Sequence, residues 1–117
     1  MTNANRLVEI ATAYWHSATL MSAIQLRLPT LIESGCHTIE GLAEAANADG
    51  TALMALLEGL CALEIIERKD GKFYNRDEAR LFLVEDRPTF MGSALLYNAD
   101  VYPKWGSLCH GQLGPET

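Results

Sequence analysis

The spacing of apolar and polar positions divides the chain into segments, most of which have the period of a helix. The first such segment runs from Asn5 to Leu26, where apolar residues recur in one stripe: Leu7, Ala11, Tyr14, Ala18 and Met21. Ile10, Trp15 and Ile24 fall outside this stripe, so polar residues fill only a narrow strip. A helix that is apolar around most of its circumference is buried on more than one side. We therefore expect one long helix with a second chain covering its outer side.

The next segments carry the usual signals for helix ends. Pro29 favours the start of a short helix, and Gly35 is placed to close it. Thr38 is a candidate N-cap for a further helix, with Glu40 in its first turn. The inner face of that helix is expected to be formed by Ile39, Leu42 and either Ala45 or Ala46.

A second helix, expected at about Gly50 to Leu63, follows after a short break. Its apolar positions have helical spacing, so the two helices form a helix-turn-helix pair. The period then changes: β-branched and aromatic residues flank Asp70-Gly71, a dipeptide that favours a type I′ hairpin turn. The pattern predicts a mainly α-helical, winged-helix-like domain with one small β-hairpin.

The remaining chain is expected to be helical again. Asp77 is a candidate cap for one or two helical turns, and Pro88 is expected to redirect the chain. A further helical stretch follows, which we expect Pro103 to interrupt. The Gly-containing polar segment 109–117 is expected to be a flexible tail after a domain at 1–108.

The winged-helix shape raises the question of nucleic acid binding. Side chains that read base edges are typically Arg, Lys, Asn or Gln, and the helix at Gly50–Leu63 has none of them. Its charged residue is Glu58, and acidic residues lie among the basic residues of the hairpin. The net charge is -6 and the pI about 4.9, whereas phosphate-binding proteins usually present a basic face. We expect no nucleic acid partner.

The amino-acid composition further restricts the class of protein. The 117 residues are 49% hydrophobic and 21% charged, which is typical of one folded domain. Cys36, Cys61 and Cys109 are an odd number at long spacings, which favours reduced thiols over a disulfide framework or a metal site. No signal peptide and no membrane-spanning run is evident. We therefore expect a cytoplasmic protein with no membrane partner.

Five short motifs follow one another in a fixed order within Leu7–Leu108. They are Ala23-Leu26-Leu28, Thr38-Leu42-Ala43, Leu53-Leu56-Leu57-Leu60, Phe73-Tyr74 and Phe82-Leu83. Their order and spacing resemble the N-terminal dimerisation domain of S-adenosylmethionine-dependent O-methyltransferases of the caffeic acid, hydroxyindole and polyketide-tailoring type. The sequence departs from the family at Arg27 and Glu64, where members often have glycine.

The resemblance implies a role in methyl transfer to a hydroxyl of an aromatic small molecule in secondary metabolism. In the family, a Rossmann-like domain holds the cofactor loop and the catalytic histidine, and this sequence contains neither. His16, His37 and His110 do not lie in the context of that histidine. We therefore expect a chain that is not catalytic alone and does not itself bind S-adenosylmethionine. It would be either the N-terminal domain of a longer enzyme or a separate subunit. Its partner would be a second copy of itself, a Rossmann-like methyltransferase chain, or both.

The resemblance also implies two sets of site residues. The long first helix would approach a partner through Leu7, Ile10, Ala11, Tyr14, Trp15, Ala18 and Met21. The substrate pocket would be lined by Tyr14, Trp15, Met91, Leu95, Tyr97, Asn98, Tyr102 and Trp105. Each of these has a plainer interpretation: Tyr14 and Trp15 as interface or core, the Met and aromatic residues as core, and Asn98 as an exposed side chain. Metal and catalytic residues are not expected.

Two other functions remain open at this point. One is an acidic winged-helix regulator or protein-interaction module without methyltransferase activity. The other is an inactive relative that only dimerises. Binding to DNA at low salt would favour the regulator, because electrostatic affinity for DNA is strongest there.

Overall fold

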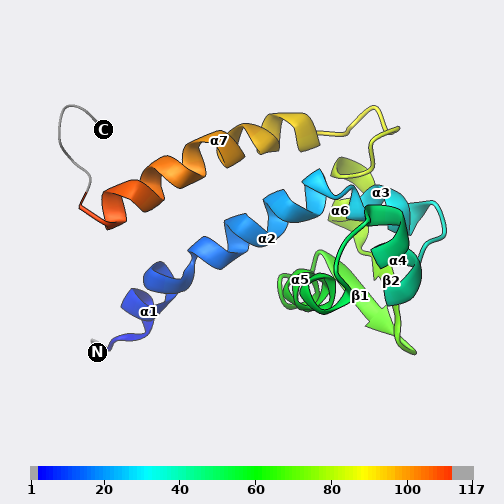
Figure 1. The fold of residues 1–117 in the computed structure, drawn as a ribbon, viewed down its shortest axis with the longest axis horizontal. Coiled ribbons are helices and arrows are strands. Elements are labelled where there is room, and N and C mark those ends of the chain that lie inside the picture. The colour runs from blue at the N-terminus through cyan, green and yellow to red at the C-terminus, as the bar shows by residue number, and fades with distance from the viewer. Residues whose placement is uncertain (1–2, 112–117) are drawn as a thin grey trace.

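The computed structural model describes residues 3–111, which form a small helical core from which two helical arms extend (Figure 1). The core holds a helix-turn-helix pair and a two-stranded antiparallel hairpin. The elements in chain order are α1 (Asn5–Thr12), α2 (Tyr14–Gln25), α3 (Leu28–Glu33), α4 (Ile39–Ala46), α5 (Gly50–Ala62), β1 (Ile66–Lys69), β2 (Lys72–Asn75), α6 (Asp77–Phe82) and α7 (Gly92–Cys109). The expected mainly α-helical, winged-helix-like class is confirmed.

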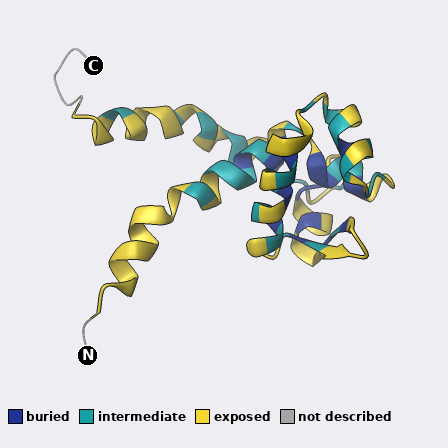
Figure 2. Ribbon diagram, turned by 60° about the horizontal axis from the view of Figure 1, so that its bottom comes forward, coloured by how far each residue is buried: buried dark blue, intermediate teal, exposed yellow. Residues whose placement is uncertain are grey.

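The hydrophobic core lies where α3, α4, α5 and the hairpin meet, as the buried residues in Figure 2 show. Its fully buried members lie on helices and on both strands of the hairpin. They are Ala23, Leu28, Ile32, Leu42, Leu53, Leu57, Leu60, Ile66 and Phe73. On α4, Leu42 is buried and Ala46 packs against the core, whereas Ala45 is exposed.

Side-chain caps begin both helices of the helix-turn-helix pair. The Thr38 hydroxyl accepts a hydrogen bond from the Gly41 amide at 3.1 Å, which confirms the predicted cap. Asp49 caps α5 by accepting from the Ala52 amide at 3.0 Å. The prediction for Asp77 is wrong: the N-cap of α6 is Arg76, and no side chain caps this end. Asp77 is instead the first helical residue, where its negative charge suits the helix dipole.

The hairpin turn has the predicted type I′ geometry. Asp70 and Gly71 have φ values of 52° and 75°, and both central residues of a type I′ turn require positive φ. The register pairs Lys69 with Lys72 on either side of the turn. The expected wing is confirmed.

The single long helix expected from Asn5 to Leu26 is divided at Ala13 into α1 and α2. The Thr12 hydroxyl donates to the carbonyl oxygen of Val8 at 2.8 Å, a contact that often bends helices. The Ala13 amide bonds to Ile10 rather than continuing the i to i−4 pattern. The apolar periodicity therefore predicted the helical segment correctly, but it carried no signal for this break.

The last helix differs from expectation in the opposite way. Helix α7 continues through Pro103, where the sequence predicts an interruption. Proline removes one backbone donor, and here it does so on an exposed stretch where water can reach the unpaired carbonyl. Helix α7 ends at Cys109, the first residue of the expected tail at 109–117. Residues 112–117 of that tail lie outside the described residues.

The two arms make the molecule more extended than a compact domain. The radius of gyration is 16.3 Å, whereas a compact chain of this length would have about 13 Å. No residue of α1 is buried, and the arms are largely exposed (Figure 2). Several large apolar side chains lie exposed on them: Leu7, Val8, Ile10, Tyr14, Tyr97, Tyr102, Trp105 and Leu108. Within residues 3–111, no helix has both the length and the apolar character needed to cross a membrane.

Candidate functional site

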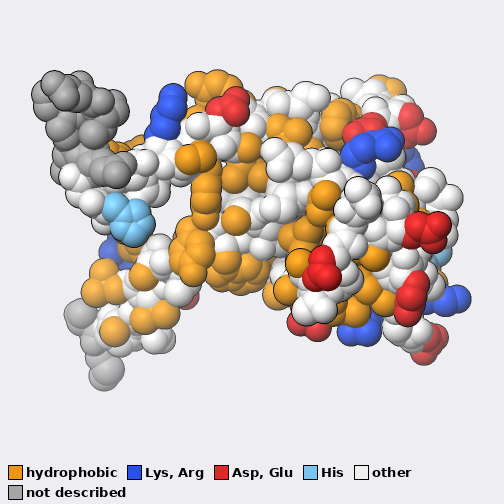
Figure 3. Space-filling view, viewed as in Figure 1, with side chains coloured by type: hydrophobic (Ala, Val, Ile, Leu, Met, Phe, Trp, Pro, Cys, Tyr) orange, Lys and Arg blue, Asp and Glu red, His pale blue; other side chains and the backbone are white. Residues whose placement is uncertain are grey.

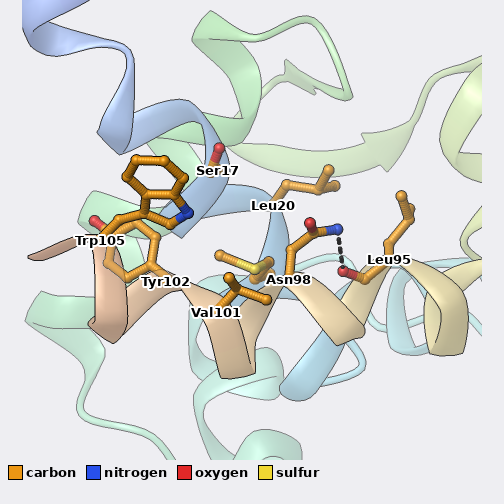
Figure 4. A pocket seen from close by; sticks show the side chains of 8 residues that line it. Ser17, Leu20, Leu95, Asn98, Val101, Tyr102 and Trp105 are labelled. Atoms are coloured by element: carbon orange, nitrogen blue, oxygen red, sulfur yellow. Dashed lines mark hydrogen bonds between the residues drawn. The ribbon is translucent and has the colours of Figure 1, made fainter. Parts of the chain in front are cut away.

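A cavity of about 250 Å³ lies between α2 and α7 (Figure 4). Helix α2 supplies three of its lining residues and α7 supplies the rest. The lining is Ser17, Leu20, Met21, Leu95, Asn98, Val101, Tyr102 and Trp105. Figure 3 shows hydrophobic side chains along the inner edge of the notch between the arms. The site is therefore a mainly apolar, open cavity.

The arms are held together at their inner ends by a small second core. Ile24 of α2 is buried with Ala79 and Leu83, and Leu95 and Leu96 of α7 pack against them. Gly92, the first residue of α7, is buried here. A Cβ atom at this position would lie 2.4 Å from Cζ of Phe90 and 3.1 Å from Cγ2 of Ile24. The absence of a side chain at Gly92 thus allows α7 to start close to α2.

All eight lining side chains are uncharged, and four are aliphatic or thioether groups. Tyr102 and Trp105 of α7 both line the cavity, toward the same end of it in Figure 4. Trp105 is 69% exposed, so much of its indole is available for contact. The Asn98 side-chain nitrogen donates to the carbonyl oxygen of Leu95 at 3.0 Å. Flat apolar surfaces with one or two polar groups are typical of sites for small aromatic molecules.

A neighbouring cavity of about 170 Å³ shares Leu20 and Leu95 with the first. It is also lined by Met91, Phe82 and Glu78, among others. Because the two cavities have walls in common, the site extends along the α2–α7 contact toward α6.

The structure brings together some of the residues predicted to line a substrate pocket. Leu95, Asn98, Tyr102 and Trp105 line the first cavity, and Met91 lines the second. Tyr97 lines neither cavity and is 70% exposed.

Tyr14 and Trp15 line neither cavity. Trp15 packs near Gly59 of α5 and meets the His16 ring edge-on, with centroids 4.3 Å apart. This packing holds α2 against the core, so Trp15 faces away from α7.

Four lining residues were missing from the sequence-based set: Ser17, Leu20, Met21 and Val101. Ser17 and Met21 are one helical turn apart, so they lie on the same face of α2. That face could have been selected only with the knowledge that α7 packs against it.

The residues expected at a partner interface fall into two groups. Leu7, Ile10, Ala11 and Tyr14 are exposed, while Trp15 and Ala18 are half-buried. Met21 is buried within this chain and belongs to the cavity wall. Thus the outward-facing part of the expected interface lies on α1 and the start of α2.

The outer face of the helix-turn-helix pair has a different character. A shallow groove between α4 and α5 is lined by apolar and acidic side chains, including Met54, Glu40 and Glu58. In Figure 3 acidic side chains surround hydrophobic ones over these two helices. Negative charge on this face would repel the phosphate backbone of DNA.

Few other side chains of the described chain are candidates for a metal site or for a reactive group. Among residues 3–111, no group of three His, Cys, Asp or Glu side chains is arranged to hold a metal ion. Burial raises the pKa of the Cys61 thiol, an effect that the nearby Glu58 adds to and Arg68 opposes. Cys61 packs against the core, so it serves as a small apolar residue.

Comparison with known families and proteins points to one class. A family model described as the O-methyltransferase dimerisation domain matches residues 8–85. Phenazine-1-carboxylate N-methyltransferase of Pseudomonas aeruginosa is 28% identical over 110 residues, which cover 94% of this chain and 33% of that protein. The S-adenosyl-L-methionine-dependent methyl transferase PigF of a Serratia species is 29% identical over 96 residues, covering 81% of this chain and 28% of the relative.

A solved structure agrees with these relatives. The pyocyanin biosynthetic protein PhzM superposes with a TM-score of 0.75 at 28% identity, covering 93% of this chain and 34% of PhzM. The chain thus spans about a third of the length of the proteins it matches.

Proposed function

This chain belongs to the family of O-methyltransferase dimerisation domains, and from that membership we propose that it forms a homodimer and supplies one wall of a substrate pocket. Relatives in this class use S-adenosylmethionine as methyl donor. The proposed whole enzyme transfers that methyl group to a hydroxyl of an aromatic small molecule in secondary metabolism. The cofactor and the catalytic base would be held by a Rossmann-like domain or partner chain.

The observation that carries the dimer is the unburied first helix. Leu7, Val8 and Ile10 are each more than half exposed, and no residue of α1 is buried. Burying apolar surface contributes about 25 cal/mol per Å², so three such side chains would favour association by several kcal/mol in total. A second copy of the chain is the partner that the family assignment supports.

The observation that supports the pocket is the cavity between α2 and α7. Its aliphatic and aromatic walls suit a flat ring system. In the proposed enzyme, these walls orient the acceptor and exclude water while the catalytic domain carries out the transfer. Orientation of this kind lowers the barrier without any catalytic group on this chain.

A hydroxyl oxygen is the acceptor that we propose, in line with the family. The relative named as a phenazine-1-carboxylate N-methyltransferase indicates that the same type of domain also accompanies transfer to nitrogen. The acceptor atom would therefore be selected mainly by the catalytic part of the enzyme, and the ring system partly by this domain.

The dimer is tested by Ile10→Glu, with Ile10→Leu as the matched control. Ile10 is 58% exposed, so a glutamate there leaves the monomer fold intact. Buried in an interface, however, an unpaired charge is costly. We expect sedimentation analysis to give a dimer for the wild type and Ile10→Leu, and a monomer for Ile10→Glu. A wild-type chain that sediments as a monomer at all accessible concentrations would disprove the proposal.

A further inference from the structure

We propose that the groove between α4 and α5 is a docking site for a basic amphipathic helix of a partner protein. The apolar side of that helix would lie on the floor of the groove, and its lysine or arginine side chains would meet the carboxylates on the rim. The groove shares no lining residue with the two cavities along the α2–α7 contact. The inference therefore goes beyond the proposed function and is tested independently of it.

The floor of the groove consists of apolar and small side chains. The groove has a volume of about 620 Å³, and Ile39 and Ala43 line it from α4 while Met54 and Ala55 line it from α5. Ile39 and Met54 are half-buried, so part of each side chain remains open to a partner. At the start of α5, a Cβ atom added to Gly50 would meet nothing within 4 Å apart from its own helix. The floor is therefore low and accessible.

The charged side chains around this floor are all acidic. Glu40 and Glu58 line the groove and are exposed, and Glu44 lies one turn after Glu40 on α4. Neither α4 nor α5 contains Lys or Arg. Within residues 3–111, none of these three carboxylates forms an ion pair. Like charges one turn apart weaken a helix slightly, so a cation from a partner would remove a cost that α4 now carries.

The combination of floor and rim specifies the chemistry of the partner. An amphipathic helix binds in a groove through apolar residues spaced at i, i+3 or i+4, and i+7. The lining of α5 runs from Gly50 to Glu58, a length of about 12 Å or two helical turns, so a partner helix of two to three turns would cover it. Met54 adds a flexible thioether that adapts to different apolar side chains. The acidic rim favours lysine or arginine beside those residues and repels the phosphates of nucleic acids.

Three synthetic helical peptides of about 14 residues, or roughly four turns, test this chemistry. The first has leucine at i, i+3, i+4 and i+7 with lysine and alanine elsewhere, the second has glutamate in place of lysine, and the third has alanine in place of leucine. Each would be titrated into the isotope-labelled full chain at low salt, with binding followed by the amide signals of Ala43 and Ala55. We expect the first peptide to bind at least about tenfold more tightly than either of the others, and its affinity to fall as salt is added.

Variants show whether the groove itself is responsible. The pair Glu40→Gln and Glu58→Gln removes two carboxylates of the rim and should weaken binding of the lysine peptide by about three- to tenfold. The matched pair Asp86→Asn and Asp100→Asn changes the net charge equally at exposed positions outside the groove and should bind as the wild type. Ala55→Arg fills the floor and adds a cation, so it should abolish binding. Circular dichroism would show that each variant is folded.

Several results would overturn the proposal. They are no binding of the lysine peptide, equal affinity for the lysine and glutamate peptides, and equal weakening by the two pairs of substitutions. Shifts confined to α1 and α7 would overturn it as well, because the peptide would then have bound to the exposed apolar arms. If the signals of Ala43 and Ala55 moved when the chain alone was diluted, the occupant would be a second copy of the chain and not a partner helix. None of these results decides the proposed dimer, which Ile10→Glu tests separately.

Discussion

At the scale of single residues, two residues with long side chains have a backbone conformation that normally favours glycine. Arg27 and Glu64 have φ values of 59° and 60°, in the left-handed region. Asn47 and Asp70 share this conformation, but short polar side chains tolerate it better than long ones. The resemblance had identified Arg27 and Glu64 as positions where glycine is common, and the backbone supplies the physical reason. Arg27 also forms an exposed ion pair with Glu85 at 2.8 Å.

Replacement of Glu64 by glycine should stabilise the protein. Glu64 is exposed and forms no ion pair within the described chain, so the substitution removes little except the strain. A residue other than glycine in the left-handed conformation costs about 1–2 kcal/mol, and glycine removes this cost. Glycine also gives the unfolded chain more conformational freedom, which cancels about 0.5–1 kcal/mol of the gain. We expect Glu64→Gly to raise the free energy of unfolding by roughly 0.5–1 kcal/mol in urea denaturation.

A matched substitution in a helix provides the control. Glu44 is exposed within α4, where glycine is unfavourable. Glu44→Gly should lower the free energy of unfolding by about 0.5–1 kcal/mol. If both variants were destabilised alike, positive φ at Glu64 would not be a source of strain.

Caps illustrate what residue types can and cannot predict. Thr38 was identified because a hydroxyl residue precedes a helical period, and its bond to Gly41 confirms this. Asp77 looks equally suitable, but the Arg76 amide is engaged with the Ile65 carbonyl at the end of the hairpin, and helix α6 begins immediately afterwards. Helix starts that are set by a strand pairing therefore have no local signal in the sequence.

At the scale of elements, the contact between Phe90 and Gly92 determines how α7 approaches α2. The Phe90 ring occupies the space where a side chain at Gly92 would lie. Alanine at this position would require the ring or the helix to move, because 2.4 Å is far below a normal contact distance. Overpacking of this kind costs typically about 1–3 kcal/mol.

A double-mutant cycle tests this contact. Gly92→Ala alone should lower the free energy of unfolding by about 1–3 kcal/mol. In a Phe90→Leu background, which provides space, the same change should cost clearly less, with a coupling energy of about 1 kcal/mol or more. Additive effects in thermal or urea denaturation would mean that the ring and the glycine do not constrain each other.

Helical segments were largely predictable from the apolar period, but their continuity was not. The period does not register the side-chain bond of Thr12 that accompanies the break at Ala13. Proline at position 103 carries a strong local penalty, yet the helix continues where its backbone faces water. The cavity was only half predictable: four of its five α7 residues were identified, with Val101 missed, while its α2 residues depend on a contact between helices far apart in the chain.

At the scale of the whole molecule, burial is distributed unevenly. The helix-turn-helix, α3 and the hairpin share one core, whereas α1 has no buried residue. Segments with few buried contacts open at low free-energy cost. The proposed homodimer would change this by covering the outer arm.

Hydrogen exchange should report this difference directly. In the Ile10→Glu monomer, amides of α1 should exchange rapidly, while those around Leu57 in α5 should remain protected. In the wild-type dimer, protection in α1 should be greater by about tenfold or more, and that around Leu57 should be little changed. Equal exchange of α1 in both proteins would mean that the partner does not cover this helix.

The close start of α7 at Gly92 also has a mechanical consequence. The helix packs against the second core in its first turns and then extends outward, so a tilt at the Phe90–Gly92 contact would swing it as a lever about that pivot. Trp105 lies about 20 Å along that lever, given a rise of about 1.5 Å per residue. A tilt of about 10° at the pivot would therefore displace the indole by roughly 3–4 Å at this helix length. A change at the Phe90–Gly92 contact as small as one added methyl group would therefore alter the width of the cavity near Trp105.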